Sequence, residues 1–395
     1  MLAASNYPSF VKYMGSKSKI IDFVIEGIND VRRTGPVLDL FSGSASLAGA
    51  IGRSVEFHSN DIQNYSRVLS TAYAYSWKTE KSPTVSTLLA RAAEIVNDVQ
   101  TSKRAYIYSY HEERSLESFR TIEEHQRLLI SESFSHKWHL FLKVYSGTWW
   151  SAEQCLWIDA LREVAEDYID DPVYSVILAS LMFAMAYCSQ GTGHYAQYRD
   201  AKNLSSLSDI SIYRRRSISK YFERKYQEVY GELSDTPPVA GFVSTAMDFK
   251  DCLSGFSGGT VYADPPYCFV HYSRFYHALE TLVLYDFPEI QLKGGEIVKG
   301  RYRVDRHQSP FCISSKVEGA FEDMFKGVAK SGSNLVLSYS NTGMIDLDRM
   351  VEIASSIFAG GNLELLTKDH QHMTLGRTGI RHRDVKECLL LMKNS

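Results

Sequence analysis

Two strand–turn–helix units near the start of the chain limit the folds that it can adopt. The apolar run 37–41 enters the small-residue segment 42–46, after which a helical pattern begins. A second apolar run, 55–58, ends in Asn60 and Asp61 and is again followed by a helical pattern. Two βα units in succession predict a parallel, doubly wound sheet, and such sheets bind ligands at the carboxyl ends of their strands.

The pattern changes in the middle of the chain, where helical periodicity dominates residues 81–235. Helices are expected there over 85–99, 152–168, 173–187 and 210–230. Short apolar runs typical of strands return later, at 241–246, 260–263, 334–339, 363–366 and 387–391. We therefore expect one α/β domain formed by 1–80 and 236–395, with a mainly helical insertion at 81–235.

Charge and cysteine usage restrict the class of protein. The chain of 395 residues has a formal net charge of −3, whereas proteins that coat nucleic acid are usually basic. This charge still permits an enzyme that contacts DNA through local basic patches. The six cysteines are scattered without a close pair, which favours free thiols in a reducing compartment and no metal site.

The chain lacks the signals of a membrane or secreted protein. Its longest apolar run, 176–187, is shorter than the roughly 18 residues that span a bilayer, so we expect a buried helix there. The opening residues 1–10 lack the charged-then-apolar order of a secretion signal. These features predict a cytoplasmic protein with no membrane partner.

The segment 39–46 joins the first strand to its helix through small residues, among them Gly43 and Ser44. Small residues let the backbone approach a ligand closely, and the helix behind presents free N–H groups. An ordinary packing turn has the same composition, and the G-x-G-x-x-G spacing of dinucleotide enzymes is absent. Asp61, at the end of the next strand, can accept hydrogen bonds from both ribose hydroxyls of an adenosine, or alternatively cap the following helix.

Asp264-Pro265-Pro266-Tyr267 is the most specific segment, and it follows the apolar run 260–263. The two prolines fix φ and remove two donors, which stiffens the loop. Asp264 supplies an anionic acceptor, the loop backbone supplies carbonyl oxygens, and Tyr267 supplies a flat face. This combination suits a planar base that carries an exocyclic amino group.

Together these segments resemble the D12-class, Dam-like DNA adenine-N6 methyltransferases. The matching segments are Lys12-Tyr13-Met14-Gly15-Ser16-Lys17, Phe41-Ser42-Gly43, Asn60-Asp61-Ile62, Met247-Asp248-Phe249, Asp264-Pro265-Pro266-Tyr267 and Glu387 in the closing strand. Ser16 replaces the second glycine of the family's K-Y-x-G-G-K opening, and Ser44 begins a departure from its usual G-x-G continuation. Residues 193–198 lie where family members carry a DNA-contacting loop.

The resemblance implies a Rossmann-like sheet that binds S-adenosyl-L-methionine (SAM), with the insertion 81–235 as the target-recognition domain. It implies these cofactor-binding residues: Lys12, Tyr13, Gly15, Lys17, Asp39, Phe41, Gly43, Ser44, Asp61, Asp248 and Phe249. It implies catalysis by Asp264, Pro265, Pro266 and Tyr267 on an adenine extruded from double-stranded DNA. A restriction endonuclease or other phage-defence subunits are the expected protein partners, and the enzyme would be nucleoid-associated when bound to DNA.

Other activities stay open at this point. Methylation of cytosine N4 uses the same geometry, but such enzymes usually carry Ser where this chain has Asp264. Methylation of RNA adenine or of a glutamine amide is also possible chemistry, and those families usually carry Asn there. A non-catalytic DNA-binding regulator on a methyltransferase fold is the alternative from another class.

Three further features could contact DNA or could serve the fold alone. Trp149 and Trp150 are expected in the core rather than as stacking platforms. The cluster 214–216 is either a phosphate grip or a solvated helix face. The basic segment 293–306 is expected to be a mobile loop that contacts DNA.

Overall fold

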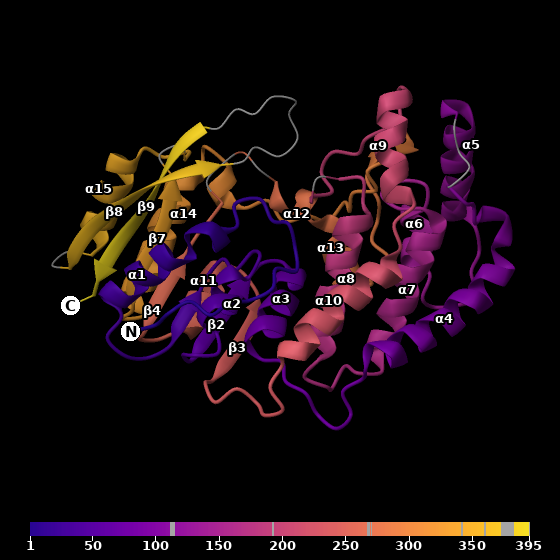
Figure 1. Cartoon of the computed structure of the whole chain (residues 1–395). Coiled ribbons are helices and arrows are strands. Elements are labelled where there is room, and N and C mark those ends of the chain that lie inside the picture. Colours follow the sequence, from indigo (N-terminus) through magenta and orange to yellow (C-terminus); the bar gives the residue numbers. More distant parts are fainter. Residues whose placement is uncertain are drawn as a thin grey trace.

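The computed structural model describes residues 1–110, 115–191, 193–266, 269, 271–340, 343–358, 361–372 and 383–394. A twisted sheet with its covering helices forms one side of the molecule, and a group of helices forms the other (Figure 1). Among the described residues, no helix is both long enough and apolar enough to cross a lipid bilayer.

The strands of the main sheet are β1 (Val37–Asp39), β2 (Phe57–Asp61), β3 (Phe242–Ala246), β4 (Thr260–Ala263), β7 (Asn334–Ser340), β8 (Asn362–His372) and β9 (Arg383–Lys393). Their order across the sheet is β3-β2-β1-β4-β7-β9-β8. All pairs from β3 to β7 are parallel, whereas β9 runs antiparallel to both β7 and β8. The expected parallel sheet is confirmed from β3 to β7, but the antiparallel β9 makes the whole sheet mixed. Its topological switch point lies between β1 and β4.

Side chains along the strands alternate between two cores on opposite faces of the sheet. In β1, Val37 belongs to the first core and Leu38 to the second, and in β7 the same holds for Val336 and Leu337. The first core includes side chains of α1 (Ile21–Val31), α2 (Ser46–Ile51) and α3 (Asn64–Ala74). The second includes side chains of α11 (Phe249–Gly255), α14 (Val317–Lys330) and α15 (Leu347–Ile357).

Helices fill the chain between α3 and β3. They are α4 (Val85–Ser102), α5 (Leu116–Arg127), α6 (Leu140–Tyr145), α7 (Ala152–Glu166), α8 (Tyr174–Cys188), α9 (Leu204–Arg214) and α10 (Ile218–Glu232). The apolar helix α8 is buried on nearly every side, as a helix without a polar face must be. It packs against α3, α7 and α10, so this helical segment shares the first core with the sheet.

The expectation of one helix over 210–230 is wrong, because α9 ends at Arg214 and α10 begins at Ile218. The side chain of Ser217 accepts a hydrogen bond from the N–H of Lys220, which caps the new helix. At the preceding terminus the Arg214 side chain is bonded inside the protein. The chain therefore forms two helices, the second with its own cap, where periodicity alone predicts one.

The shorter elements are α12 (Tyr272–Phe275), α13 (His277–Leu284), the hairpin strands β5 (Leu292–Lys293) and β6 (Glu296–Ile297), and 3-10 turns at Lys17–Ile20, Arg104–Tyr106, Leu128–Ser131 and Pro310–Cys312. In the segment 293–306, which is expected to be a mobile loop that contacts DNA, Arg301 and Arg303 are buried and are not available for such a contact. The guanidinium of Arg303 donates to both carboxylate oxygens of Asp286, at 2.7 and 2.6 Å.

Candidate active site

One cavity lies at the carboxyl ends of β1, β2 and β4, at the switch point of the sheet. The predicted site residues that line it are Tyr13, Gly15, Lys17, Asp39, Phe41, Gly43, Ser44, Asp61, Asp248, Phe249, Asp264, Pro265 and Pro266. They come from both ends of the chain, and the fold brings them to one place. Tyr267 lies outside the described residues.

Lys12 is the predicted residue that does not line this cavity. Its side chain is exposed, and the Nζ atom lies 4.4 Å from the centre of the Tyr187 ring on α8. The backbone of Lys12 continues into Tyr13, which does form part of the cavity wall. Lys12 therefore lies outside the pocket, on the surface beside it.

The turn after β1 is held against the next strand by Asp61. One carboxylate oxygen accepts from the N–H of Gly43 and the other from the N–H of Gln63, each at 2.9 Å. Gly43 has a φ of +50°, and a Cβ atom there would lie 3.1 Å from the Tyr13 ring, so a larger residue would strain the turn. Burial raises the pKa of Asp61 to about 6, although the bonds from Gln63 and Gly43 oppose this rise.

Asp39 presents an unsatisfied acceptor to the cavity. Its side chain is buried, and within the described part of the chain its Oδ1 atom has no hydrogen-bond partner. Burial raises the pKa of Asp39 well above its usual value, and the nearby carboxylates of Asp264 and Asp61 add to the rise. A ligand that donates hydrogen bonds or carries a positive charge would satisfy this site.

Lys17 lies between two carboxylates on the cavity wall. Its Nζ atom is 3.1 Å from Oδ1 of Asp264 and 2.9 Å from Oε1 of Glu387, and Lys17 and Glu387 are both buried. Ser338 on β7 donates to the same oxygen of Glu387 at 2.8 Å. The β9 strand thus supports Lys17, and Lys17 in turn contacts the loop after β4.

Two sets of contacts in the cavity, made by Ser46 and by Tyr272, were not identified from the sequence. Hydroxyl groups gather where the chain departs from the family pattern, since the Oγ atom of Ser46 lies 3.0 Å from that of Ser16 and 2.8 Å from that of Ser44. Tyr272 lines the cavity, and its ring stacks on Tyr13 with 5.9 Å between ring centres. The spacing of small residues and tyrosines in the sequence contains no sign of these contacts.

Asp248 and Phe249 join the cavity to helix α11. The carboxylate of Asp248 accepts from the N–H of Lys250 at 2.9 Å and so caps the helix. The Phe249 ring packs against Phe41, with 5.9 Å between ring centres, and against Phe311, at 5.2 Å. These contacts form an apolar wall suited to a flat ring, with a carboxylate at its edge.

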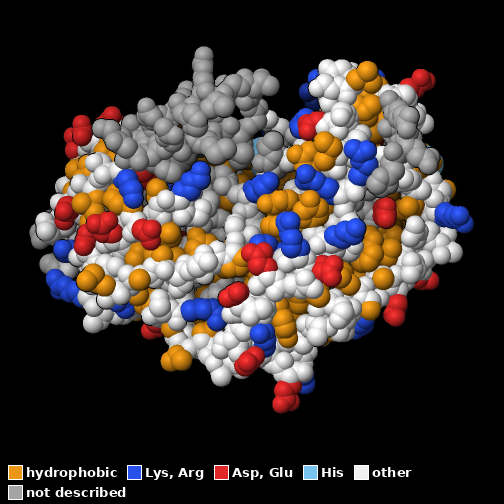
Figure 2. All heavy atoms as spheres, viewed as in Figure 1, with side chains coloured by type: hydrophobic (Ala, Val, Ile, Leu, Met, Phe, Trp, Pro, Cys, Tyr) orange, Lys and Arg blue, Asp and Glu red, His pale blue; other side chains and the backbone are white. Residues whose placement is uncertain are grey.

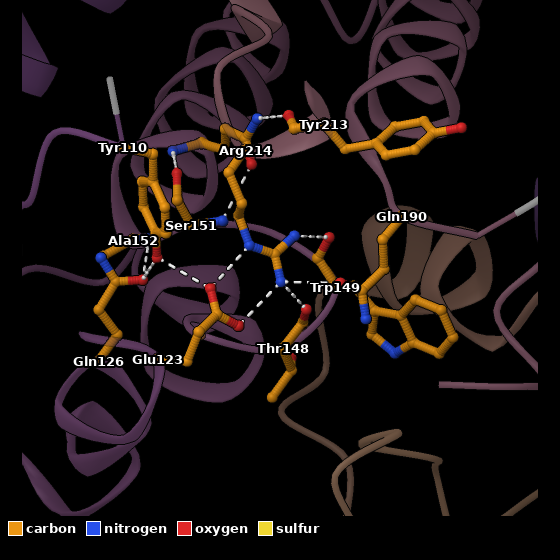
Figure 3. Close-up of polar contacts among 12 residues, drawn as sticks. Tyr110, Glu123, Gln126, Thr148, Trp149, Ser151, Ala152, Gln190, Tyr213 and Arg214 are labelled. Atoms are coloured by element: carbon orange, nitrogen blue, oxygen red, sulfur yellow. Dashed lines mark hydrogen bonds and ion pairs between the residues drawn. The ribbon is translucent and has the colours of Figure 1, made fainter. Parts of the chain in front are cut away.

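The interpretation of 214–216 as a phosphate grip is wrong for Arg214, which is buried among the helices (Figure 3). Its guanidinium donates to both carboxylate oxygens of Glu123, at 2.8 and 3.0 Å, and to the carbonyl of Trp149 at 2.9 Å. Trp149 and Trp150 are themselves fully buried, so their expected place in the core is confirmed.

Comparison with known proteins identifies the family. The sequence model of the D12 class N6 adenine-specific DNA methyltransferases matches residues 13–233. The chain belongs to this family. The matched stretch includes the turn after β1 and the helical segment, and it ends before Asp264.

Individual relatives agree with this membership. The chain is similar to the modification methylase LlaI of Lactococcus lactis subsp. lactis, at 23% identity over 98% of this chain and 55% of the relative. It is also similar to the type II methyltransferase M.FokI of Planomicrobium okeanokoites, at 24% identity over 88% of this chain and 47% of the relative. The chain thus spans about half the length of these two relatives.

Proposed function

We propose that this chain is a site-specific DNA adenine-N6 methyltransferase that takes its methyl group from SAM. The observation that carries the proposal is the position of Asp264, Pro265 and Pro266 in the same cavity as the turn after β1 and Asp61. Family membership supports an adenine substrate, and the carboxylate at position 264 disfavours cytosine N4, for which Ser is usual.

The cavity residues fit SAM. Asp61 would accept from its ribose hydroxyls, Asp248 and Phe249 would hold its adenine ring, and the backbone at Gly43 permits close approach. The unsatisfied Oδ1 atom of Asp39 suits its ammonium group. When bound, this cofactor supplies a methyl group activated by a sulfonium.

The target adenine would have to leave the DNA stack, because N6 cannot reach a methyl donor inside a duplex. Asp264 and the carbonyl of Pro265 would accept the two N6 hydrogens and orient the nitrogen lone pair, while Tyr267 would stack on the base. Aligning reactants in this way supplies effective molarities of about 10⁵ M or more. Lys17 would hold the Asp264 carboxylate in place.

Residues 1–80 and 236–395 would form the catalytic domain, and 81–235 would read the DNA sequence. The names of the relatives support a role in modification, with a restriction endonuclease or another defence subunit as partner. The test is to incubate the purified chain with duplex DNA and SAM carrying a labelled methyl group, and then to analyse the nucleosides. Label in N6-methyladenine supports the proposal, and label only in N4-methylcytosine or only in RNA would replace it with one of the alternatives.

A further inference from the structure

A row of cations lies over aromatic rings beside the cavity. Lys12 lies 4.4 Å from the ring centre of Tyr187, and Arg224 on α10 lies 5.6 Å from the same ring. Arg224 also lies 5.0 Å from the ring centre of Tyr221. Arg216 lies 4.6 Å from that of Tyr213. We call these three cations and three tyrosines the basic–aromatic surface.

The rings hold the cations in fixed places. Tyr187 on α8 and Tyr221 on α10 are stacked, with 5.4 Å between ring centres, so the two helices present one continuous aromatic layer. Tyr221 and Arg224 are three residues apart on α10 and share a face of the helix. Arg216 donates from Nη1 to the carbonyl of Tyr187, whereas no hydrogen bond is found for the guanidinium of Arg224 within the described residues, so its N–H groups can make bidentate contacts with an anion.

The three cations of this surface have no ion-pair partner among the described residues. Lys225, on the same helix as Arg224, does pair with Glu228. Burial lowers the pKa of Lys12, and the positive charge of Arg216 lowers it further. Bringing these cations together therefore costs free energy, which a bound polyanion would recover.

The surface begins at the rim of the cavity. Lys12 adjoins Tyr13 in the cavity wall and packs against Gly193, where an added Cβ atom would lie 2.7 Å from the Lys12 side chain. Across the middle of the face in Figure 2, where Figure 1 shows α8 and α10, basic side chains lie among hydrophobic ones, with some acidic side chains in between. The Lys12 end of the row therefore adjoins the cavity wall.

We propose that the basic–aromatic surface binds the phosphate backbone of duplex DNA and leads the target nucleotide to the cavity. This inference rests on the proposed function, because it assumes a DNA substrate. Three cations that form no ion pair among the described residues fit a polyphosphate better than the mixed charges of a protein partner.

The experiment measures the affinity of the full chain for a duplex oligonucleotide between 0.05 and 0.3 M salt, without methyl transfer. The slope of log K against log salt concentration is negative, and each lost phosphate contact makes it less steep by about 0.9. We expect Arg224→Gln to make the slope less steep by about this amount. The double variant, which carries both Lys12→Gln and Arg224→Gln, should change it by about twice as much. If the variant and the wild type bind DNA equally at 1 M salt, a slope change of about 0.9 makes the variant's affinity roughly eightfold lower at 0.1 M salt.

Lys326→Gln on α14 is the matched control, since it removes an exposed cation that pairs with Glu322 on the second core's side. Calorimetric SAM binding and the thermal midpoint should stay unchanged in all variants, which separates a lost contact from misfolding. Unchanged slopes in Arg224→Gln and the double variant would overturn this inference while leaving adenine methylation by the wild-type protein intact. A wild-type chain that binds no duplex at any salt concentration would overturn the inference and the proposed function together.

Discussion

Lys17 pairs with Asp264 on the wall of the cavity, with 3.1 Å between the ammonium nitrogen and the carboxylate oxygen. Glu387 contacts the same ammonium from the other side, at 2.9 Å. Two carboxylates thus share one cation, and this arrangement determines how strongly Lys17 holds Asp264.

Glu387→Gln should slow methyl transfer without weakening SAM binding. With one carboxylate neutralised, Lys17 interacts more strongly with Asp264 and competes with the N6 hydrogens for its oxygens. A hydrogen bond to a charged group contributes about 1.5–3 kcal/mol, so weakening it in the transition state should lower kcat at least about tenfold. The KM for SAM should change little. Glu364→Gln, an exposed change on β8, is the control. A raised KM for SAM with an unaltered kcat would show instead that Lys17 serves the cofactor.

Arg214→Ala should destabilise the fold, whereas Arg215→Ala should not. Arg214 is buried against Glu123, so its removal leaves a buried carboxylate without its partner, which costs about 3–5 kcal/mol. The neighbouring Arg215 is exposed, and its loss should change the free energy of unfolding by less than about 0.5 kcal/mol. Urea denaturation of both variants measures the difference, and equal midpoints would contradict the buried ion pair.

The local parts of the site were predictable from the sequence. The turn at Gly43, Asp61 and the loop at Asp264 each belong to a strand–turn segment whose conformation depends on neighbouring residues. Parallel strands place such segments at one edge of the sheet, so their meeting in one cavity follows from the fold.

The long-range contacts could not be predicted in this way. Lys17 and Glu387 come from opposite ends of the chain, and only the insertion of β9 beside β7 brings them together. Likewise, Arg214 and Arg215 are neighbouring residues of the same type, and only Arg214 is buried, because its side of α9 faces Glu123 on α5. Tertiary packing decides such cases, and periodicity contains no information about it.

Asp61 should make SAM affinity depend on pH. Its pKa is raised to about 6, so below pH 6 the carboxylate becomes protonated and accepts ribose hydrogen bonds less well. We expect SAM to bind about tenfold more weakly at pH 5 than at pH 7.5, because only about a tenth of the carboxylate is then ionised. Titration calorimetry at both pH values measures this change.

Asp61→Asn provides the control for this pH dependence. The variant should bind SAM weakly, and its SAM affinity should lose the pH dependence that centres on pH 6.

The stability of the fold should depend on pH in the opposite direction to SAM binding. A carboxyl whose pKa is raised on folding stabilises the fold below about pH 4 and loses that contribution as the pH rises through 6. Equal pH dependence of SAM binding in the variant and the wild type would exclude Asp61 as its source.

The central claim is that the Asp264 carboxylate accepts a hydrogen bond from adenine N6 during transfer. Its most direct test is a single-turnover measurement on duplex DNA with labelled SAM, comparing the wild-type chain with Asp264→Ala and analysing the nucleosides. The account predicts N6-methyladenine from the wild type, and a rate lowered at least about 10²-fold in Asp264→Ala while SAM and DNA still bind. Near-normal transfer by Asp264→Ala, or a wild-type product found only as N4-methylcytosine, would contradict it.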